Sequence, residues 1–159
     1  MERKTKFLVH ASFIAAIYVV LTYISAMFGL SSGVIQVRFS EMLTVLPVFT
    51  PAAVPGLFIG CLLSNILSGC VIWDVIFGSL ATLLGAIFTY ILKKHKYFAP
   101  IPPILSNVLI VPFVLRYAYG IPGSIPYFMA TIGIGEIISC GVLGIILIKA
   151  LEKNKNIFN

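Results

Sequence analysis

The sequence predicts an all-α integral membrane protein with six transmembrane helices and with both termini on the cytoplasmic side. The 159 residues are 60% hydrophobic and only 10% charged, and the mean hydropathy is +1.08. These values are too apolar for an ordinary soluble domain. The apolar runs are long enough to cross a bilayer, and most charged residues gather in three short clusters that separate those runs.

The three clusters set the expected orientation. They lie at the N-terminus, at 93–96 and at 149–155. Cytoplasmic loops of membrane proteins carry an excess of Lys and Arg, and with six helices all three clusters fall on one side. Membrane topology therefore explains the net charge of +6. Nucleic acid is not an expected partner, because the basic residues form no stripe with interleaved aromatic residues.

The first helix is expected over residues 7–28, a run that contains no Lys, Arg, Asp or Glu. At about 1.5 Å per residue this run is long enough to span a bilayer. Arg3, Lys4 and Lys6 imitate the start of a signal peptide. The apolar run is too long for a signal sequence, however, and no A-x-A cleavage site follows it. We therefore expect a retained span.

Prolines divide the next apolar region into two helices. Residues 42–73 are uncharged, too many for one span, and include Pro47, Pro51 and Pro55. Proline interrupts helices and favours turns, so helices are predicted at 40–50 and 54–69. Residues 34–39 partly alternate between apolar and polar side chains, which is typical of an extended connecting segment.

The last three helices are expected at 74–92, 103–116 and 126–148. The first of them ends at the 93–96 cluster, the second opens at Pro102 and Pro103, and the third ends at the 149–155 cluster. No internal repeat or low-complexity stretch divides the chain. Residues 1–159 are therefore expected to form a single six-helix membrane domain.

Five charged residues lie outside the three clusters: Arg38, Glu41, Asp74, Arg116 and Glu136. An ionisable side chain at membrane depth costs roughly 2.5–3.5 kcal/mol and usually faces a partner, a cavity or a ligand. Four of the five fall near the external ends of the predicted helices, and Glu136 lies near mid-membrane. They predict a polar pocket that opens to the outside beneath the 29–40 and 117–125 loops.

Several of these residues also have a purely structural interpretation. Asp74 could cap the fourth helix, and Ser40 could cap the second with Glu41 in its first turn. Arg116 could extend to the lipid headgroups, and Arg38 could pair with Glu41 as a structural latch.

Glu136 is far from either end of its helix, so its structural interpretation is a pair with an arginine. Asn65 and Asn107 are further candidates for the pocket, although buried amides also serve as interhelical hydrogen bonders. Aromatic residues near the expected mouth could stack on a ligand or form an interfacial belt; these are Trp73, Tyr117, Tyr119 and Tyr127.

Other chemistry has little support in this sequence. It contains no G-x-x-x-x-G-K-[ST] phosphate loop and no Ser/His/Asp or Cys/His set, so we expect no catalytic residue and no enzyme activity. Cys61, Cys70 and Cys140 lie in apolar segments and are expected to pack as small hydrophobic residues, so neither a metal site nor a cofactor is predicted. The three acids and two arginines weakly favour a cationic or donor-rich ligand, and an aromatic-lined pocket suits a flat heterocycle.

Small residues four positions apart recur at Ala11 and Ala15 and at Gly56 and Gly60. Such spacings allow another helix to approach closely. That helix could belong to this chain or to another membrane protein.

The segment IQVRFSEMLTVLP at 35–47, continued by FTPAAVPGLFIGC at 49–61, resembles the QueT family. The segments DVIFGSLATL at 74–83 and GIGE at 133–136 are also similar to that family. Its members are substrate-binding (S) components of energy-coupling factor transporters in the bacterial plasma membrane, associated with uptake of queuosine precursors.

The resemblance implies six helices, a pocket near the external face and no ATPase in this chain. The expected partners are a transmembrane coupling (T) protein and two ATPase subunits. The A-x-x-x-A face of the first helix, here Ala11 and Ala15, would dock on them.

The implied ligand is a 7-deazaguanine, such as queuine or its aminomethyl precursor. Glu41 or Glu136 could accept its N1–H and exocyclic amine as a bidentate pair. Asp74 or the remaining glutamate could meet the side-chain amine. Arg38 or Arg116 could donate to the carbonyl of the base.

Two alternatives come from other functional classes. The first is a self-sufficient, proton-coupled carrier with Glu136 as proton relay. The second is a small non-transporting membrane scaffold or enzyme subunit, in which the five isolated charges are structural latches.

Overall fold

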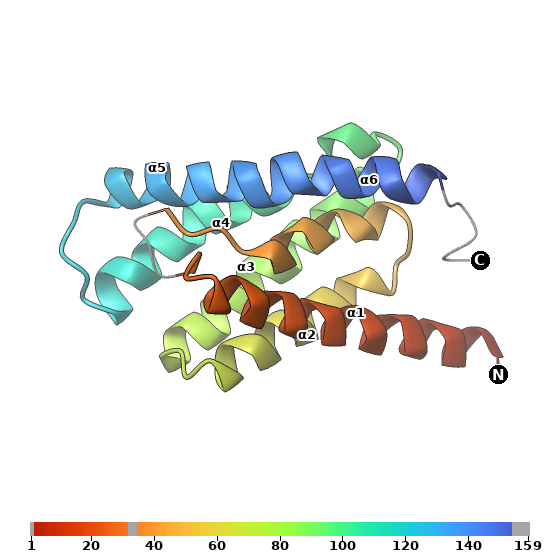
Figure 1. Ribbon diagram of the computed structural model, residues 1–159, viewed down its shortest axis with the longest axis horizontal. Coiled ribbons are helices and arrows are strands. Elements are labelled where there is room, and N and C mark those ends of the chain that lie inside the picture. The colour runs from red at the N-terminus through yellow and green to blue at the C-terminus, as the bar shows by residue number, and fades with distance from the viewer. Residues whose placement is uncertain (1, 32–34, 154–159) are drawn as a thin grey trace.

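The computed structural model describes residues 2–31 and 35–153, and every regular element in these two ranges is a helix (Figure 1). The all-α prediction is therefore confirmed. Residues 32–34 of the predicted 29–40 loop and 154–155 of the last basic cluster lie outside the described residues. The α-helices are α1 (Glu2–Met27), α2 (Ala53–Leu67), α3 (Ile72–Ile91), α4 (Ile101–Phe113), α5 (Ile125–Glu136) and α6 (Gly144–Lys153). The 3-10 helices are η1 (Phe39–Val48) and η2 (Lys96–Phe98), and the π-helical segments are η3 (Val114–Ala118) and η4 (Ile137–Leu143).

Four helical stretches are long and apolar enough to cross a membrane: Arg3–Met27, Ile72–Ile91, Lys96–Ala118 and Ile125–Lys153. The other two apolar helices are shorter, since η1 has 10 residues and α2 has 15. At about 2.0 Å per residue for a 3-10 helix and 1.5 Å for an α-helix, each is roughly 20 Å long. Both are therefore shorter than the roughly 30 Å of a bilayer core.

Two capping interpretations made from the sequence are wrong. The N-cap of α3 is Val71, so Asp74 lies inside the first turn of the helix and does not precede it. The N-cap of η1 is Arg38, so Ser40 is also inside its helix. Ser40 Oγ instead accepts a hydrogen bond from Thr22 Oγ1 of α1 at 2.9 Å. The caps of α3 and η1 therefore lie three and two residues earlier than the polar side chains suggested.

The last long helix is continuous from α5 through η4 to α6 (Figure 1). It begins at Ile125, one residue before the predicted start, and Ser124 caps it by accepting a hydrogen bond from Tyr127 N, with Pro126 in the first turn. The π-helical turns interrupt the α-helical pattern in its middle. Within this helix, η4 supplies the buried side chains Ser139 and Cys140.

Small residues bring α1 and α2 into close contact. A methyl group on Gly56 would lie 2.7 Å from the backbone oxygen of Ala11, and one on Gly60 would lie 3.1 Å from Ala15 Cα. Ala11 and Ala15 are accordingly only 7% and 6% exposed. In this structure α2 covers both alanines, as the alternative of packing within the chain requires, and the docking of another protein on them stays a prediction.

The segment between α1 and η1 runs across α5, the helix that carries Glu136. Arg38 is extended, as the alternating pattern predicted. The carbonyl oxygen of Gln36 lies only 2.1 Å from the place where a side chain on Gly135 would begin. Arg38 N donates a hydrogen bond to Ser139 Oγ at 3.1 Å. Glycine at 135 thus lets this segment lie beside Glu136.

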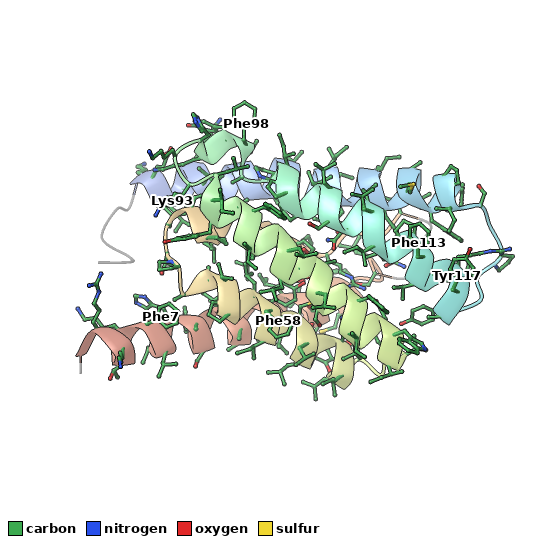
Figure 2. All side chains as sticks on the ribbon, turned by 180° about the vertical axis from the view of Figure 1, so that it is seen from behind. Phe7, Phe58, Lys93, Phe98, Phe113 and Tyr117 are labelled. Atoms are coloured by element: carbon green, nitrogen blue, oxygen red, sulfur yellow. The ribbon has the colours of Figure 1, made fainter. Side chains whose placement is uncertain are left out.

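The start of α1 and the end of α6 lie at the same end of the molecule (Figure 1). The loop after α3 is at that end too, since Lys96 Nζ forms an ion pair with Glu152 Oε1 at 3.2 Å. Figure 2 shows Lys93 near this end and Tyr117 near the opposite end. The basic clusters, so far as they are described, therefore share one end of the helical bundle, as the orientation rule requires.

Candidate functional site

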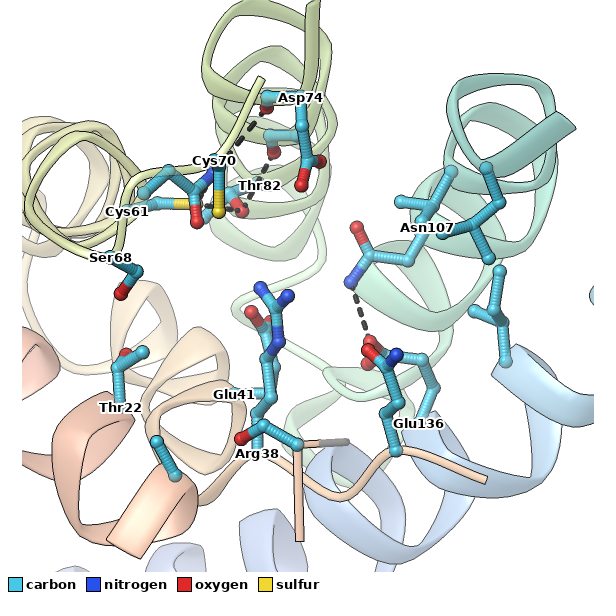
Figure 3. A pocket seen from close by; sticks show the side chains of 18 of the residues that line it. Thr22, Arg38, Glu41, Cys61, Ser68, Cys70, Asp74, Thr82, Asn107 and Glu136 are labelled. Carbon is cyan, nitrogen blue, oxygen red and sulfur yellow. Dashed lines mark hydrogen bonds between the residues drawn. The ribbon is translucent and has the colours of Figure 1, made fainter. Parts of the chain in front are cut away.

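A cavity of about 320 Å³ lies between the helices and is lined mostly by polar side chains (Figure 3). This volume is in the range of pockets that bind small molecules. All four long helical stretches contribute lining residues, and so do η1 and α2. Six of the nine predicted pocket residues line it: Arg38, Glu41, Asn65, Asp74, Asn107 and Glu136.

Three carboxylates and one guanidinium line this cavity, so its wall carries an excess of formal negative charge. The guanidinium belongs to Arg38, whose side chain extends into the cavity (Figure 3). The sequence predicted two arginines here. Arg116 is exposed, and its Nη1 donates to the carbonyl oxygen of Ile121 at 3.4 Å. Because Arg116 is not part of the lining, the cavity is more acidic than predicted.

Glu41 lies in η1 and is only 3% exposed. Its Oε1 accepts a hydrogen bond from the hydroxyl of Tyr18 in α1, which is itself 1% exposed. Its Oε2 has no hydrogen-bond partner among the described residues. Arg38 forms no ion pair with Glu41 in the part of the chain that the structure describes, so the predicted latch is absent there.

Glu136 lies at the end of α5 and is held by two neutral donors. Asn107 Nδ2 of α4 donates to its Oε1 at 2.8 Å. Cys140 Sγ of η4 donates to its Oε2 at 3.0 Å. The sequence suggested an arginine as the structural partner, and the described residues provide an amide and a thiol instead.

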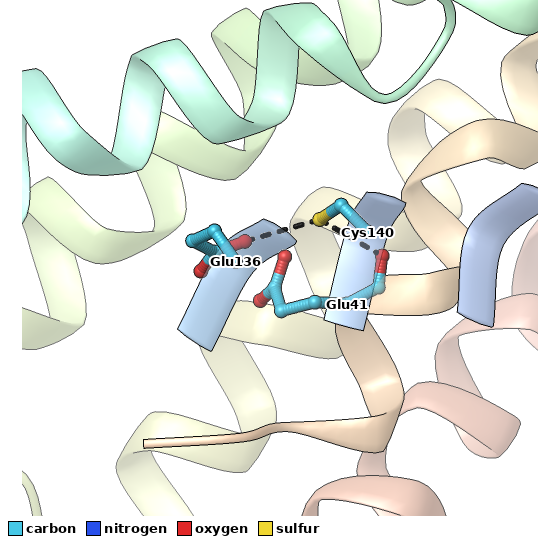
Figure 4. A group of neighbouring side chains, drawn as sticks. All are labelled: Glu41, Glu136 and Cys140. Atoms are coloured by element: carbon cyan, nitrogen blue, oxygen red, sulfur yellow. Dashed lines mark hydrogen bonds between the residues drawn. The ribbon is translucent and has the colours of Figure 1, made fainter. Parts of the chain in front are cut away.

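Glu41, Glu136 and Cys140 form one compact cluster (Figure 4). One potential ligand atom from each of the three lies within 4.8 Å of the other two. Carboxylates and a thiol at such separations are close enough for a cation or a proton to bind between them. The sequence predicted no metal site and did not group these three residues, because it could not show that they meet.

Asp74 occupies a second region of the cavity, where the loop after η3 meets α3. Its Oδ2 accepts a hydrogen bond from the hydroxyl of Tyr119 at 2.8 Å. Asn65 Nδ2 donates to the backbone oxygen of Asp74 at 3.4 Å. Burial, followed by the adjacent Asp74 carboxylate, raises the pKa of Tyr119 above its ordinary value. Tyr119 therefore remains a hydrogen-bond donor at neutral pH.

Trp73 and Tyr117, which were also predicted to line the pocket, are 56% and 77% exposed and lie outside it. They line a separate apolar groove on the outside of α3 and α4. Trp73 stacks on Phe77 and Tyr117 stacks on Phe113, with ring centroids 6.0 Å and 6.4 Å apart. Their positions agree with the interfacial aromatic belt that the sequence left as an alternative.

Sequence reasoning missed several residues of this site. Tyr18 was not singled out, because one tyrosine in an apolar helix carries no distinctive signal. The three cysteines were expected only to pack as hydrophobic residues, yet Cys61 and Cys70 line the cavity. Cys140 Sγ also contacts the backbone oxygen of Glu41 at 3.4 Å. A cysteine one helical turn after a glutamate is the signal that could have identified the last of them.

Comparison with known proteins gives one consistent result. Residues 8–153 match the family model described as QueT transporter. The queuosine precursor transporter QueT of Lactococcus lactis subsp. cremoris is 41% identical over 83 residues, which cover 52% of this chain and 48% of that protein. The matched region thus spans about half the length of this curated relative. No solved structure matches the chain.

Proposed function

This chain belongs to the QueT transporter family, and on that premise we propose that it is the S component of an energy-coupling factor importer for a queuosine precursor. It is a multi-pass membrane protein. In this role it binds the precursor in the polar cavity on the external side. An ATP-driven module, formed by a T component and two ATPase subunits, then releases the substrate to the cytoplasm.

The observation that carries this proposal is the acidic, small-molecule-sized cavity. Asp74, Glu41 and Glu136 line it, and Arg38 is the one basic residue among the described lining. A 7-deazaguanine such as queuine or its aminomethyl precursor carries polar groups that these lining side chains can bind. It has N–H donors along the guanine edge, a carbonyl acceptor and a side-chain amine. Carboxylates accept paired N–H groups in a bidentate manner, and the Arg38 guanidinium supplies donors for the carbonyl.

We include the six-helix topology in the proposal. All six apolar helices then belong to one membrane domain, with both termini and the 93–96 loop in the cytoplasm. The position of the cavity supports this orientation, because two of its lining residues, Tyr119 and Ile121, lie at the end that would face outside. They belong to the loop that follows Tyr117, at the end of the molecule opposite Lys93 (Figure 2). The short helices η1 and α2 fit such a domain if the chain around them lines the polar cavity.

The test is ligand-dependent thermal stabilisation of the detergent-purified chain. The ligands are 7-aminomethyl-7-deazaguanine, queuine, guanine, thiamine, riboflavin and biotin. A ligand at 100 times its Kd adds about 2.7 kcal/mol to the free energy of unfolding. We expect a shift with the 7-deazaguanines alone. Arg38→Gln should weaken it, and Arg116→Gln, outside the cavity, should leave it unchanged.

Stabilisation by another vitamin would overturn the substrate assignment and keep a binding role. No stabilisation by any of the six ligands, in a sample shown to be folded, would contradict the S-component proposal.

The cluster around Glu136 also favours one second candidate, a self-sufficient proton-coupled carrier. A buried carboxylate beside another carboxylate is an arrangement that proton relays use. This candidate requires uptake by the purified chain alone in liposomes under a proton gradient. An S component requires its ATP-driven module for the same uptake. Reconstitution with and without that module separates the two.

A further inference from the structure

The cluster of Glu41, Glu136 and Cys140 has more acceptors than donors. Cys140 supplies one S–H, which is directed to Glu136 Oε2. The Tyr18 hydroxyl serves Glu41 Oε1, and the Asn107 amide serves Glu136 Oε1. The fourth carboxylate oxygen, Glu41 Oε2, is buried without a partner among the described residues. Figure 4 shows the Glu41 carboxylate directed toward the other two side chains.

No basic side chain among the described residues lies within ion-pair distance of either glutamate. Among the described residues the one ion pair joins Lys96 and Glu152, and neither of these lines the cavity. Arg38 extends into the same cavity without forming an ion pair with either of them. The other titratable side chains that line this cavity or bond to the pair are Tyr18 of α1, Cys61 of α2, Asp74 of α3 and Cys140 of η4, together with Cys70 and Tyr119 of the loops.

Two carboxylates at this separation repel each other strongly when both are ionised in a low-dielectric interior. A proton held between them removes one negative charge and gives Glu41 Oε2 the donor that it lacks. A cation between them would do the same. An unpaired buried carboxylate without either would be far more costly.

We propose that Glu41 and Glu136 form one subsite, which holds a shared proton when the cavity is empty and a cationic amine of the ligand when it is occupied. This inference rests on the proposed function, because the amine is that of the transported compound. On binding, the ammonium group enters between the carboxylates, both become ionised, and the proton leaves through the cavity to solvent. One positive charge replaces another, so the net charge of the cavity does not change.

The first experiment examines the empty protein and needs no ligand. Infrared spectroscopy detects the carbonyl stretch of a protonated carboxylic acid, which an ionised carboxylate lacks. We expect this band in the wild-type protein at neutral pH and its loss in both Glu41→Gln and Glu136→Gln. In each variant the remaining carboxylate has no partner with which to share a proton. Asp74→Asn, which changes a carboxylate bonded to Tyr119, is the matched control and should keep the band.

A wild-type protein without the band would overturn the inference, and so would a band that both glutamine variants retain. A stoichiometric metal ion in the purified protein would also overturn it, because the ion would then take the place of the proton. If the glutamine variants do not fold, the wild-type band must still disappear as the pH is raised.

The second experiment measures proton release during binding, by calorimetry in buffers that differ in ionisation enthalpy. We expect one proton released per molecule of 7-aminomethyl-7-deazaguanine, and none with 7-methyl-7-deazaguanine, which lacks the amine. Affinity for the amine should rise about tenfold per pH unit while the empty pair is protonated. Binding without proton release would refute this inference and leave the proposed function intact. No binding of any 7-deazaguanine would refute the proposed function, while the infrared result still decides whether a proton is shared.

Discussion

The side-chain amide of Asn107 donates a hydrogen bond to Oε1 of Glu136 across 2.8 Å, and this contact joins α4 to the last long helix beside the cavity. Asn107 is 6% exposed, so water cannot readily replace it. A neutral donor in this position stabilises the glutamate without forming the ion pair that would neutralise it.

Asn107→Leu should lower the free energy of unfolding by about 1–3 kcal/mol, because the partly buried Oε1 of Glu136 loses its donor. The measurement is thermal or chemical unfolding in detergent. Replacing both partners with apolar groups of similar shape can be nearly neutral, so Asn107→Leu combined with Glu136→Leu should recover most of the loss. Simple additivity of the two substitutions would show that the contact does not stabilise the fold.

Tyr18→Phe should lower the free energy of unfolding by a similar amount, about 1–3 kcal/mol, because it removes the donor to Glu41 Oε1 and leaves a buried carboxylate without a partner. The ring remains, so the packing against α2 is kept. Tyr23→Phe on the same helix is the control, since Tyr23 is 39% exposed. Equal effects of the two substitutions would contradict a specific role for the Tyr18 hydroxyl.

Tyr119→Phe should weaken ligand binding roughly fivefold, on the basis of about 1 kcal/mol for one hydrogen bond. The substitution releases the loop after η3 from Asp74, whose Oδ2 accepts the Tyr119 hydroxyl. Surface plasmon resonance with the immobilised protein would show the change mainly as faster dissociation. Tyr117→Phe, two residues earlier and outside the cavity, should leave both rates unchanged.

Gly60→Ala should destabilise the protein by about 1–3 kcal/mol through overpacking between α1 and α2. The new methyl group would lie 2.8 Å from Tyr18 Cβ and 3.1 Å from Ala15 Cα. Gly133→Ala is the matched control, because its nearest contact would be an ordinary 3.5 Å from Val108 Cγ2. Alanine also favours the helix there by up to about 1 kcal/mol. A milder effect at Gly60 than at Gly133 would contradict the packing described for α1.

The sequence predicted the order and approximate bounds of the six helical segments, because apolar composition and proline positions act locally. It also identified six of the residues that line the cavity, four of them charged and two of them amides, because polar groups in an apolar run usually face a partner or a cavity. It could not separate Arg38 from Arg116. Both are basic residues near a predicted helix end, and the difference lies in the tertiary path of the segment that crosses Gly135.

The neighbour of Ala11 and Ala15 within the chain could not be predicted for a related reason. Small residues on a helix indicate a close neighbour but do not identify it. The complementary pair Gly56 and Gly60 was visible in the sequence, at the same spacing of four residues. Pairing the two motifs with each other would have placed α1 against α2, which is where the structure has them.

The π-helical turn η4 has a consequence for how this site tolerates changes in chain length. A π-turn accommodates one additional residue within an α-helix, and here it turns two consecutive residues, Ser139 and Cys140, toward the interior. Deleting a single residue from Ile137–Leu143 would return the turn to α-helical geometry while α5 and α6 remain in phase. The outer faces of the helix would persist, and the contacts to Arg38, Glu41 and Glu136 would be lost. The shortened helix would thus still insert into the membrane, but it would no longer hold the residues that line the cavity in place.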